Sequence, residues 1–86
     1  MANYEVEVKK SAANEIADLP SKDIQRIVEK IQNLRSYPRP SGSEKLSGDD
    51  KYRIRQGTYR VLYEIDDATL TVTVVKIAHR REVYRK

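Results

Sequence analysis

Hydrophobic and polar residues follow first a strand spacing and then a helix spacing along the first part of the chain. Apolar side chains alternate with glutamates across residues 3–9, which predicts a half-buried strand. A short apolar stripe predicts a helix that Ser11 caps, that runs to Leu19 and that Pro20 ends. From Ser21 to about Arg35, a stronger helical period predicts a second helix. Its apolar positions are Ile24, Ile27, Val28, Ile31 and Leu34.

The second half of the chain shows a strand pattern interrupted by turn residues. Residues 52–55, 58–65 and 70–78 are rich in β-branched and aromatic side chains, and short turns separate them. The expected order is therefore β-α-α-β-β-β, a two-layer α+β domain covering residues 1–86. In this fold a helical hairpin packs on a mainly antiparallel four-stranded sheet, and a short basic tail follows the last strand.

The first predicted hairpin sorts its side chains onto two faces. If Gln56 and Gly57 form a two-residue loop, Arg53 lies opposite Arg60, and Arg55 shares their face. The other face then carries the apolar and aromatic side chains Tyr52, Ile54, Tyr59, Val61 and Tyr63. A one-residue slip would bury the arginines, so the faces are well specified.

The second predicted hairpin extends the same two faces to the last strand. With Asp67 and Ala68 as its loop, apolar residues again meet apolar residues. Continued alternation then places Ile77, His79 and Arg81 on the face of the arginines.

Three arginines on one face have two interpretations. They could simply solvate an open sheet surface, with their stems along apolar neighbours and Glu64 pairing with one of them. Alternatively they form a cationic site for a polyanion, for which phosphate is the obvious ligand. Directly opposed arginines repel each other, and a sheet built only for stability would place an acid at one of the two positions. This repulsion favours the second interpretation.

Charge and composition support the cationic site and exclude several function classes. The 86 residues carry 17 Lys and Arg against 13 Asp and Glu, a net charge of +4. Residues 1–50 hold 8 basic and 9 acidic side chains, whereas residues 51–86 hold 9 and 4, so the excess lies in the second part. No Cys and a single His exclude disulfides, thiol nucleophiles and multi-histidine metal sites. Without an apolar run long enough for a membrane span or a signal peptide, we expect a cytoplasmic protein.

An ordered series of short motifs resembles the RelE/ParE superfamily of bacterial toxins, and its RelE branch most closely. The series consists of Lys45-Leu46, Tyr52-Arg53-Ile54-Arg55, Gly57-Thr58-Tyr59-Arg60-Val61-Leu62-Tyr63 and His79-Arg80-Arg81-Glu82-Val83-Tyr84. The resemblance implies an endoribonuclease that cuts mRNA in the ribosomal A site without metal or cofactor. The ribosome, including its 16S rRNA, would be a binding partner. It also implies a RelB-like antitoxin partner. We expect that antitoxin to be acidic or to lay an amphipathic helix on an apolar strip of Leu62, Val75 and Ile77.

The resemblance further implies a set of site residues. The catalytic residues would be Arg53, Arg55, Arg60, Arg81 and Tyr84. The RNA-binding residues would be Lys45, Lys51, His79, Arg80, Arg85 and Lys86. The best-known RelE pattern has lysines where Arg53 and Arg55 stand, and arginine can hardly act as a base because its pKa is above about 12. The base role therefore falls on Tyr84 or His79. Arg80 and Arg81 compete for the family's late arginine, and face parity favours Arg81.

Two other functions fit parts of the pattern. A ParE-type toxin that poisons DNA gyrase shares the fold and the basic second half, but Tyr84 favours the RelE branch. A non-enzymatic nucleic-acid binder could use residues 21–35 as a recognition helix, but the polar side of that helix mixes acids with bases.

Overall fold

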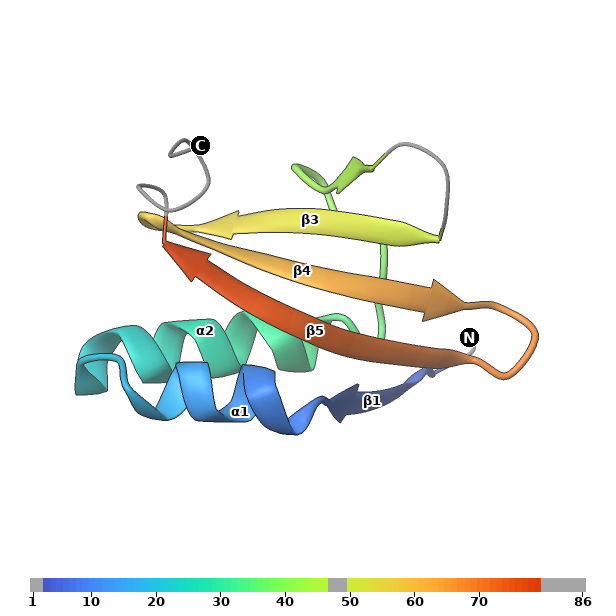
Figure 1. Cartoon of the computed structure of the whole chain (residues 1–86). Helices are drawn as coiled ribbons and strands as arrows, with labels where there is room; N and C mark the ends of the chain where they lie inside the picture. The colour runs from blue at the N-terminus through green and yellow to red at the C-terminus, as the bar shows by residue number, and fades with distance from the viewer. Residues whose placement is uncertain (1–2, 47–49, 80–86) are drawn as a thin grey trace.

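A computed structural model describes residues 3–46 and 50–79 of the chain (Figure 1). The elements are β1 (Glu5–Val8), α1 (Lys10–Ala17), α2 (Ser21–Asn33), β2 (Glu44–Lys45), β3 (Lys51–Gln56), β4 (Tyr59–Asp66) and β5 (Thr71–His79). The two predicted helices and the four predicted strands are all present, and β2 is an additional short strand.

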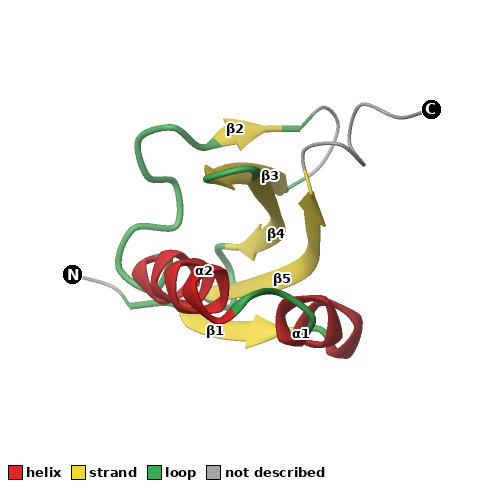
Figure 2. Cartoon of the chain, turned by 90° about the vertical axis from the view of Figure 1, so that its left-hand side faces the viewer, coloured by secondary structure: helices red, strands yellow, loops and turns green. Residues whose placement is uncertain are grey.

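The strands form one five-stranded sheet in the order β1-β5-β4-β3-β2. β1 runs parallel to β5, and every other neighbouring pair is antiparallel. The predicted four-stranded sheet is corrected to a five-stranded mixed sheet because β2 adds to the edge of β3. Both helices cover the same face of this sheet, and the other face is open (Figures 1 and 2). The α+β arrangement is thereby confirmed.

The helices meet the core through a few apolar side chains. Ala12 of α1 is buried, as are Ile27, Ile31 and Leu34 at α2, whereas Val28 is exposed on the outside of the predicted stripe. The predicted Ser11 cap is wrong, because α1 already begins at Lys10 and no side chain caps it.

Pro20 separates the two helices as predicted. Proline cannot donate a backbone hydrogen bond, so it ends one helix and is tolerated where the next one starts. Its carbonyl oxygen accepts the N–H groups of Asp23 and Ile24, each at 2.9 Å, in the first turn of α2.

The register of the first hairpin differs from the prediction by two residues. Its loop is Gly57–Thr58, so Gln56 pairs with Tyr59 and Arg55 pairs with Arg60. Gly57 has a φ of +62°, which suits the first loop position of a II′ turn and explains why the loop begins there. A shift by two residues leaves each side chain on its predicted face, because the side-chain period of a strand is two.

The second hairpin contains a bulge that reverses the faces at the end of β5. Tyr63 pairs with Val74, but the residue before it, Leu62, pairs with Lys76. Val75 is therefore an extra residue in β5. The side chain of Glu15 in α1 holds this stretch, accepting the Ile77 N–H at 2.9 Å and pairing with the Lys76 ammonium at 2.8 Å.

The predicted placement of the end of β5 is therefore wrong. Ile77 lies opposite Val61 and is buried in the core, and His79 lies opposite Tyr59 rather than on the face of the arginines. Ala78 takes the place opposite Arg60. The apolar strip expected for an antitoxin helix loses Ile77 for the same reason.

Candidate nucleic-acid interface

Three arginines lie together on the open face of the sheet, away from the helices. Arg53 and Arg55 alternate along β3, and Arg60 of β4 stands directly opposite Arg55. The shared face is confirmed, although the opposed pair is Arg55–Arg60 and not Arg53–Arg60. Arg60 is only 4% exposed, Arg53 is half-buried and Arg55 is exposed. We call these three side chains the arginine face.

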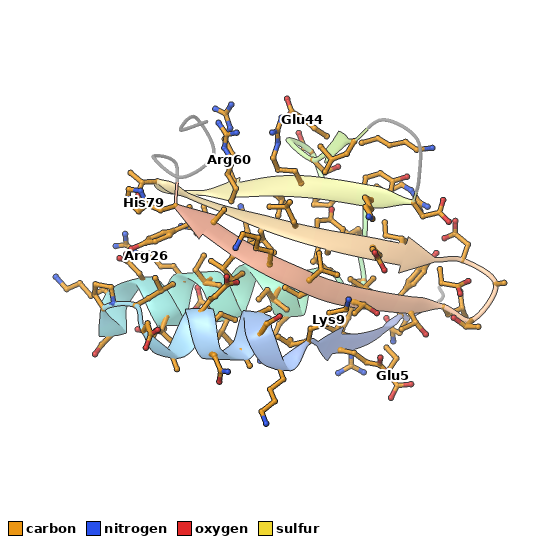
Figure 3. All side chains as sticks on the ribbon, in the orientation of Figure 1. Glu5, Lys9, Arg26, Glu44, Arg60 and His79 are labelled. Atoms are coloured by element: carbon orange, nitrogen blue, oxygen red, sulfur yellow. The ribbon has the colours of Figure 1, made fainter. Side chains whose placement is uncertain are left out.

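Glu44 of β2 also lies at the arginine face. It stands directly opposite Arg53 across the β2–β3 pair, and Figure 3 shows Glu44 and Arg60 on the side of the sheet away from the helices. Its Oε1 atom accepts hydrogen bonds from both the Nε (3.0 Å) and the Nη2 atoms of Arg53. These bonds and the charge of Arg53 lower the pKa of the Glu44 carboxyl, and the charges of Arg55 and Arg60 lower it further. One carboxylate thus stands among three guanidinium groups.

Glu44 was not among the predicted site residues, because it lies outside the segments whose hydrophobic pattern predicts a helix or a strand. A strand of two residues shows no period, and β2 becomes recognisable only through its pairing with β3.

The predicted RNA-binding lysines lie in a different part of the open face. A hollow of about 560 Å³ adjoins the start of β3 and the start of β5. Its lining residues are Lys45, Asp50, Lys51, Glu64, Ile65, Asp66, Thr69, Thr71 and Thr73. Glu64 stands directly opposite Lys51. Because three carboxylates accompany two ammonium groups, this hollow lacks the positive excess of the arginine face.

His79 lies on the helix side of the sheet. Its ring meets the Tyr59 ring edge-on at a centroid distance of 5.2 Å, and its Nε2 atom is 3.4 Å from the Thr58 hydroxyl. The Tyr59 hydroxyl in turn donates a hydrogen bond to Asp23 of α2 at 3.0 Å. Burial, together with that bond, raises the pKa of Tyr59. The structure therefore does not bring His79 onto the arginine face.

The remaining predicted site residues lie outside the described residues. They are Arg80, Arg81, Tyr84, Arg85 and Lys86. The bulge in β5 removes the alternation argument that favoured Arg81 over Arg80, because it changes which residues share a face.

A fourth arginine takes part in a separate cluster beneath the other end of the sheet. Arg39 donates hydrogen bonds to the Tyr52 hydroxyl at 2.9 Å and to Asp67 Oδ2 at 2.8 Å, and its guanidinium lies 5.2 Å from the Tyr52 ring centroid. The Tyr4 hydroxyl donates to Asp67 Oδ1 at 2.7 Å. The hydrogen bonds from Arg39 and Tyr4 lower the pKa of Asp67. We call these four residues the Arg39 cluster.

Within residues 3–46 and 50–79, no group of three or more His, Cys, Asp or Glu side chains could hold a metal ion. None of the helices in those ranges is long and apolar enough to cross a membrane. Guanidinium groups such as those of the arginine face bind phosphate oxygens and stabilise added charge on phosphorus.

Comparisons with known proteins agree on one family. A family model described as the ParE toxin of a type II toxin–antitoxin system, parDE, matches residues 6–84. The chain is 32% identical over 87 residues to toxin RelG of Mycobacterium tuberculosis, covering 96% of this chain and 98% of that protein.

Solved structures of toxin–antitoxin complexes show the same fold. The RelE–RelB complex from the archaeon Pyrococcus horikoshii OT3 matches with a TM-score of 0.83 and 30% identity, covering 91% of this chain and 96% of the other. The RelBE2 complex of Mycobacterium tuberculosis matches with a TM-score of 0.81 and 29% identity, covering 92% and 100%.

Proposed function

The chain belongs to the RelE/ParE superfamily of type II toxins and is RelE-like, and from this premise we propose that it is a ribosome-dependent endoribonuclease that cleaves mRNA in the A site. Its partners would be a RelB-like antitoxin, the ribosome with its 16S rRNA, and the mRNA, all in the cytoplasm. The antitoxin partner is supported by the RelE–RelB complexes among the similar structures.

The arginine face is the observation that carries this proposal. It places Arg55 directly opposite Arg60 in the sheet, against their mutual repulsion, and adds Arg53 on the same face. A phosphate group bound between these side chains would offset that repulsion. Guanidinium is always charged at physiological pH and grips phosphate oxygens with two parallel hydrogen bonds.

The proposed reaction is metal-independent attack of a ribose 2′-oxygen on the adjacent phosphorus. The new P–O2′ bond forms while the P–O5′ bond breaks, which leaves a 2′,3′-cyclic phosphate and a 5′-hydroxyl product. A base takes the proton of the 2′-hydroxyl, and an acid donates a proton to the departing 5′-oxygen. Arg53, Arg55 and Arg60 would stabilise the charge that develops on the phosphate oxygens.

The base would come from the carboxyl-terminal residues. His79 packs on Tyr59 at the helix side, which favours Tyr84 as the base. Arg80 or Arg81 would supply one more guanidinium for the phosphate. Lys45 and Lys51, in their mixed-charge hollow, would at most touch flanking nucleotides. Orientation by the ribosome would lower the demands on each of these groups.

Induction in cells tests the proposal. We expect growth arrest, with 5′ ends of mRNA fragments mapping inside translated codons by primer extension. Arg60→Ala and Tyr84→Ala should each relieve the arrest while circular dichroism shows a folded domain. Growth arrest with intact mRNA, or full toxicity of both variants, would contradict the proposal.

A second candidate is a ParE-type toxin that poisons DNA gyrase, since the matching family model carries the ParE description. Purified gyrase distinguishes the two functions. A gyrase poison would trap the cleaved enzyme–DNA complex in vitro and leave ribosome-bound mRNA whole. The nuclease would cleave ribosome-bound mRNA and would not trap the gyrase–DNA complex.

A further inference from the structure

The contact between Glu44 and Arg53 places an anion at the arginine face. We propose that Glu44 occupies the phosphate position at Arg53, so that RNA binds this face only by displacing the carboxylate. Glu44 would then set the affinity and the salt dependence of RNA binding. This inference rests on the proposed function, because it assumes that RNA phosphate is the ligand.

The geometry of the pair is that of a bound oxyanion. Arg53 uses its Nε and Nη2 atoms, and both hydrogen bonds end on Oε1 of Glu44. These two donors lie on one edge of the guanidinium, and arginine uses paired donors of this kind for carboxylate and phosphate alike. Arg53 therefore cannot give the same edge to a phosphate while Glu44 holds it.

The surrounding charges also act on the carboxylate. Arg55 and Arg60 both favour the ionised form of Glu44, so the carboxylate lies within the field that would attract a phosphate. An incoming phosphate would meet repulsion from Glu44 before it met full attraction from the arginines.

The carboxylate is held loosely enough to leave. β2 is two residues long and lies at the edge of the sheet, where it pairs with β3 alone. The Glu44 side chain is 55% exposed, so its head group can turn into solvent. Exposed ion pairs of this kind contribute little to stability, and a polyanion can replace one partner.

A role for Glu44 as the proton acceptor fits the same contacts less well. A general base works best when its pKa is near the working pH, whereas the arginine neighbours lower the pKa of this carboxyl. The atom that would accept the proton also already accepts two hydrogen bonds from Arg53.

RNA binding by three proteins tests the inference: the wild type, Glu44→Gln and the control Glu29→Gln. Glu29 is exposed on α2, so the control makes the same change in net charge on the helix side. The probe is a fluorescent single-stranded RNA of about ten nucleotides with 2′-O-methyl riboses, which cannot be cleaved, and the readout is fluorescence anisotropy. We expect Glu44→Gln to tighten binding about three-fold at low salt and Glu29→Gln to bind like the wild type. The slope of log K against log salt should steepen by about 0.7 for the additional phosphate contact.

A double-mutant cycle with Arg53→Ala identifies the mechanism. If Glu44 competes for Arg53, the gain from Glu44→Gln should shrink when Arg53 is absent. Equal RNA binding by Glu44→Gln and Glu29→Gln would overturn the inference. Loss of mRNA cleavage in Glu44→Gln with unchanged RNA binding would also overturn it, because Glu44 would then act as a proton acceptor. If Arg53→Ala weakens binding but Glu44→Gln has no effect, this inference alone fails. If none of the proteins binds the RNA probe, this inference is overturned, whereas the proposed function is decided separately by mRNA cleavage on ribosomes.

Discussion

The Arg39 cluster and the arginine face use the same residue type in opposite ways. Arg39 has a partner for each part of its side chain: Asp67 for one nitrogen, the Tyr52 hydroxyl for another and the Tyr52 ring for its flat face. At the arginine face, the Glu44 carboxylate pairs with Arg53, and its pKa is lowered further by the charges of Arg55 and Arg60. Arg39 links distant segments of the chain, whereas the arginine face gathers like charges on one side of the sheet, as a site for an anionic ligand does.

The position of each cluster in the fold agrees with this division. The Arg39 cluster joins residues that are far apart in the sequence, since Tyr4 bonds Asp67 and Arg39 bonds Tyr52. The arginine face lies on two adjacent strands, β3 and β4, which are paired directly along their backbones. Replacing an arginine in the first cluster should therefore reduce stability, and replacing one in the second should reduce activity.

The largest expected effect is that of Arg60→Ala, which should lower mRNA cleavage about a hundred-fold or more. Removing one preorganised donor to a developing charge commonly has an effect of that size. Cleavage by toxin added to programmed ribosomes measures it. Because Arg60 is almost fully buried, Arg55→Ala serves as the companion variant, since Arg55 is exposed and its removal leaves no cavity. Normal cleavage by both variants would contradict the role of the arginine face.

Arg39→Ala should affect stability and not activity. It should lower the free energy of unfolding by about 1 to 2 kcal/mol, while the folded molecules still cleave mRNA. The estimate covers two hydrogen bonds and one cation–π contact, reduced because the side chain is 41% exposed. Urea unfolding followed by circular dichroism measures it. Arg26→Ala, on the exposed side of α2, is the matched control and should change stability little. A loss of activity without a loss of stability would break the comparison.

The faces of the arginines were predictable because strand alternation and the turn residue Gly57 both act locally. An error of two residues in the hairpin register did no harm, since it moved no side chain to the other face. The order of helices and longer strands was predictable for the same reason, because each has a period or a proline boundary of its own.

The features that were missed depend on contacts between distant segments. The bulge that moved Ile77 into the core lies where Glu15 of α1 binds the backbone of β5, and no local pattern marks it. Glu44 becomes part of the site only through pairing of a two-residue strand. The partners of Arg39 could not be foreseen either, because Asp67 lies 28 residues further along the chain.

Tyr63→Phe tests a second contact that supports the fold and should have a smaller effect than Arg39→Ala. We expect it to lower the free energy of unfolding by about 1 kcal/mol. The Tyr63 ring is fully buried and stacks on Tyr52, and its hydroxyl donates to the Pro38 carbonyl at 2.8 Å. Phenylalanine keeps the stacking and removes the hydroxyl, with its bond to Pro38 and its interaction with the Ser43 side chain. Tyr37→Phe, at a residue 61% exposed, is the control and should leave the unfolding midpoint unchanged.

The same tyrosine predicts an alkaline limit to stability. Burial raises the pKa of Tyr63 from 10.0 to about 12, so the folded state favours the neutral phenol. Its contribution is fully present below pH 10 and is lost as the pH rises towards 12. Unfolding midpoints measured across that window should fall more steeply for the wild type than for Tyr63→Phe. Parallel curves for the two proteins would contradict this assignment.

The smallest expected effect is an acid limit at Asp67. Hydrogen bonds from Arg39 and Tyr4 lower the pKa of Asp67 below 3.8, so the folded state favours the carboxylate. The stabilisation is present above that value and is lost as the pH falls through the lowered pKa. Asp67→Asn should therefore flatten the decline in unfolding midpoint below about pH 4, whereas Glu29→Gln should leave it as in the wild type. Neither substitution lies at the arginine face, so mRNA cleavage at neutral pH should stay unchanged in both variants. A loss of cleavage in Asp67→Asn would show that the Arg39 cluster and the arginine face do not act separately.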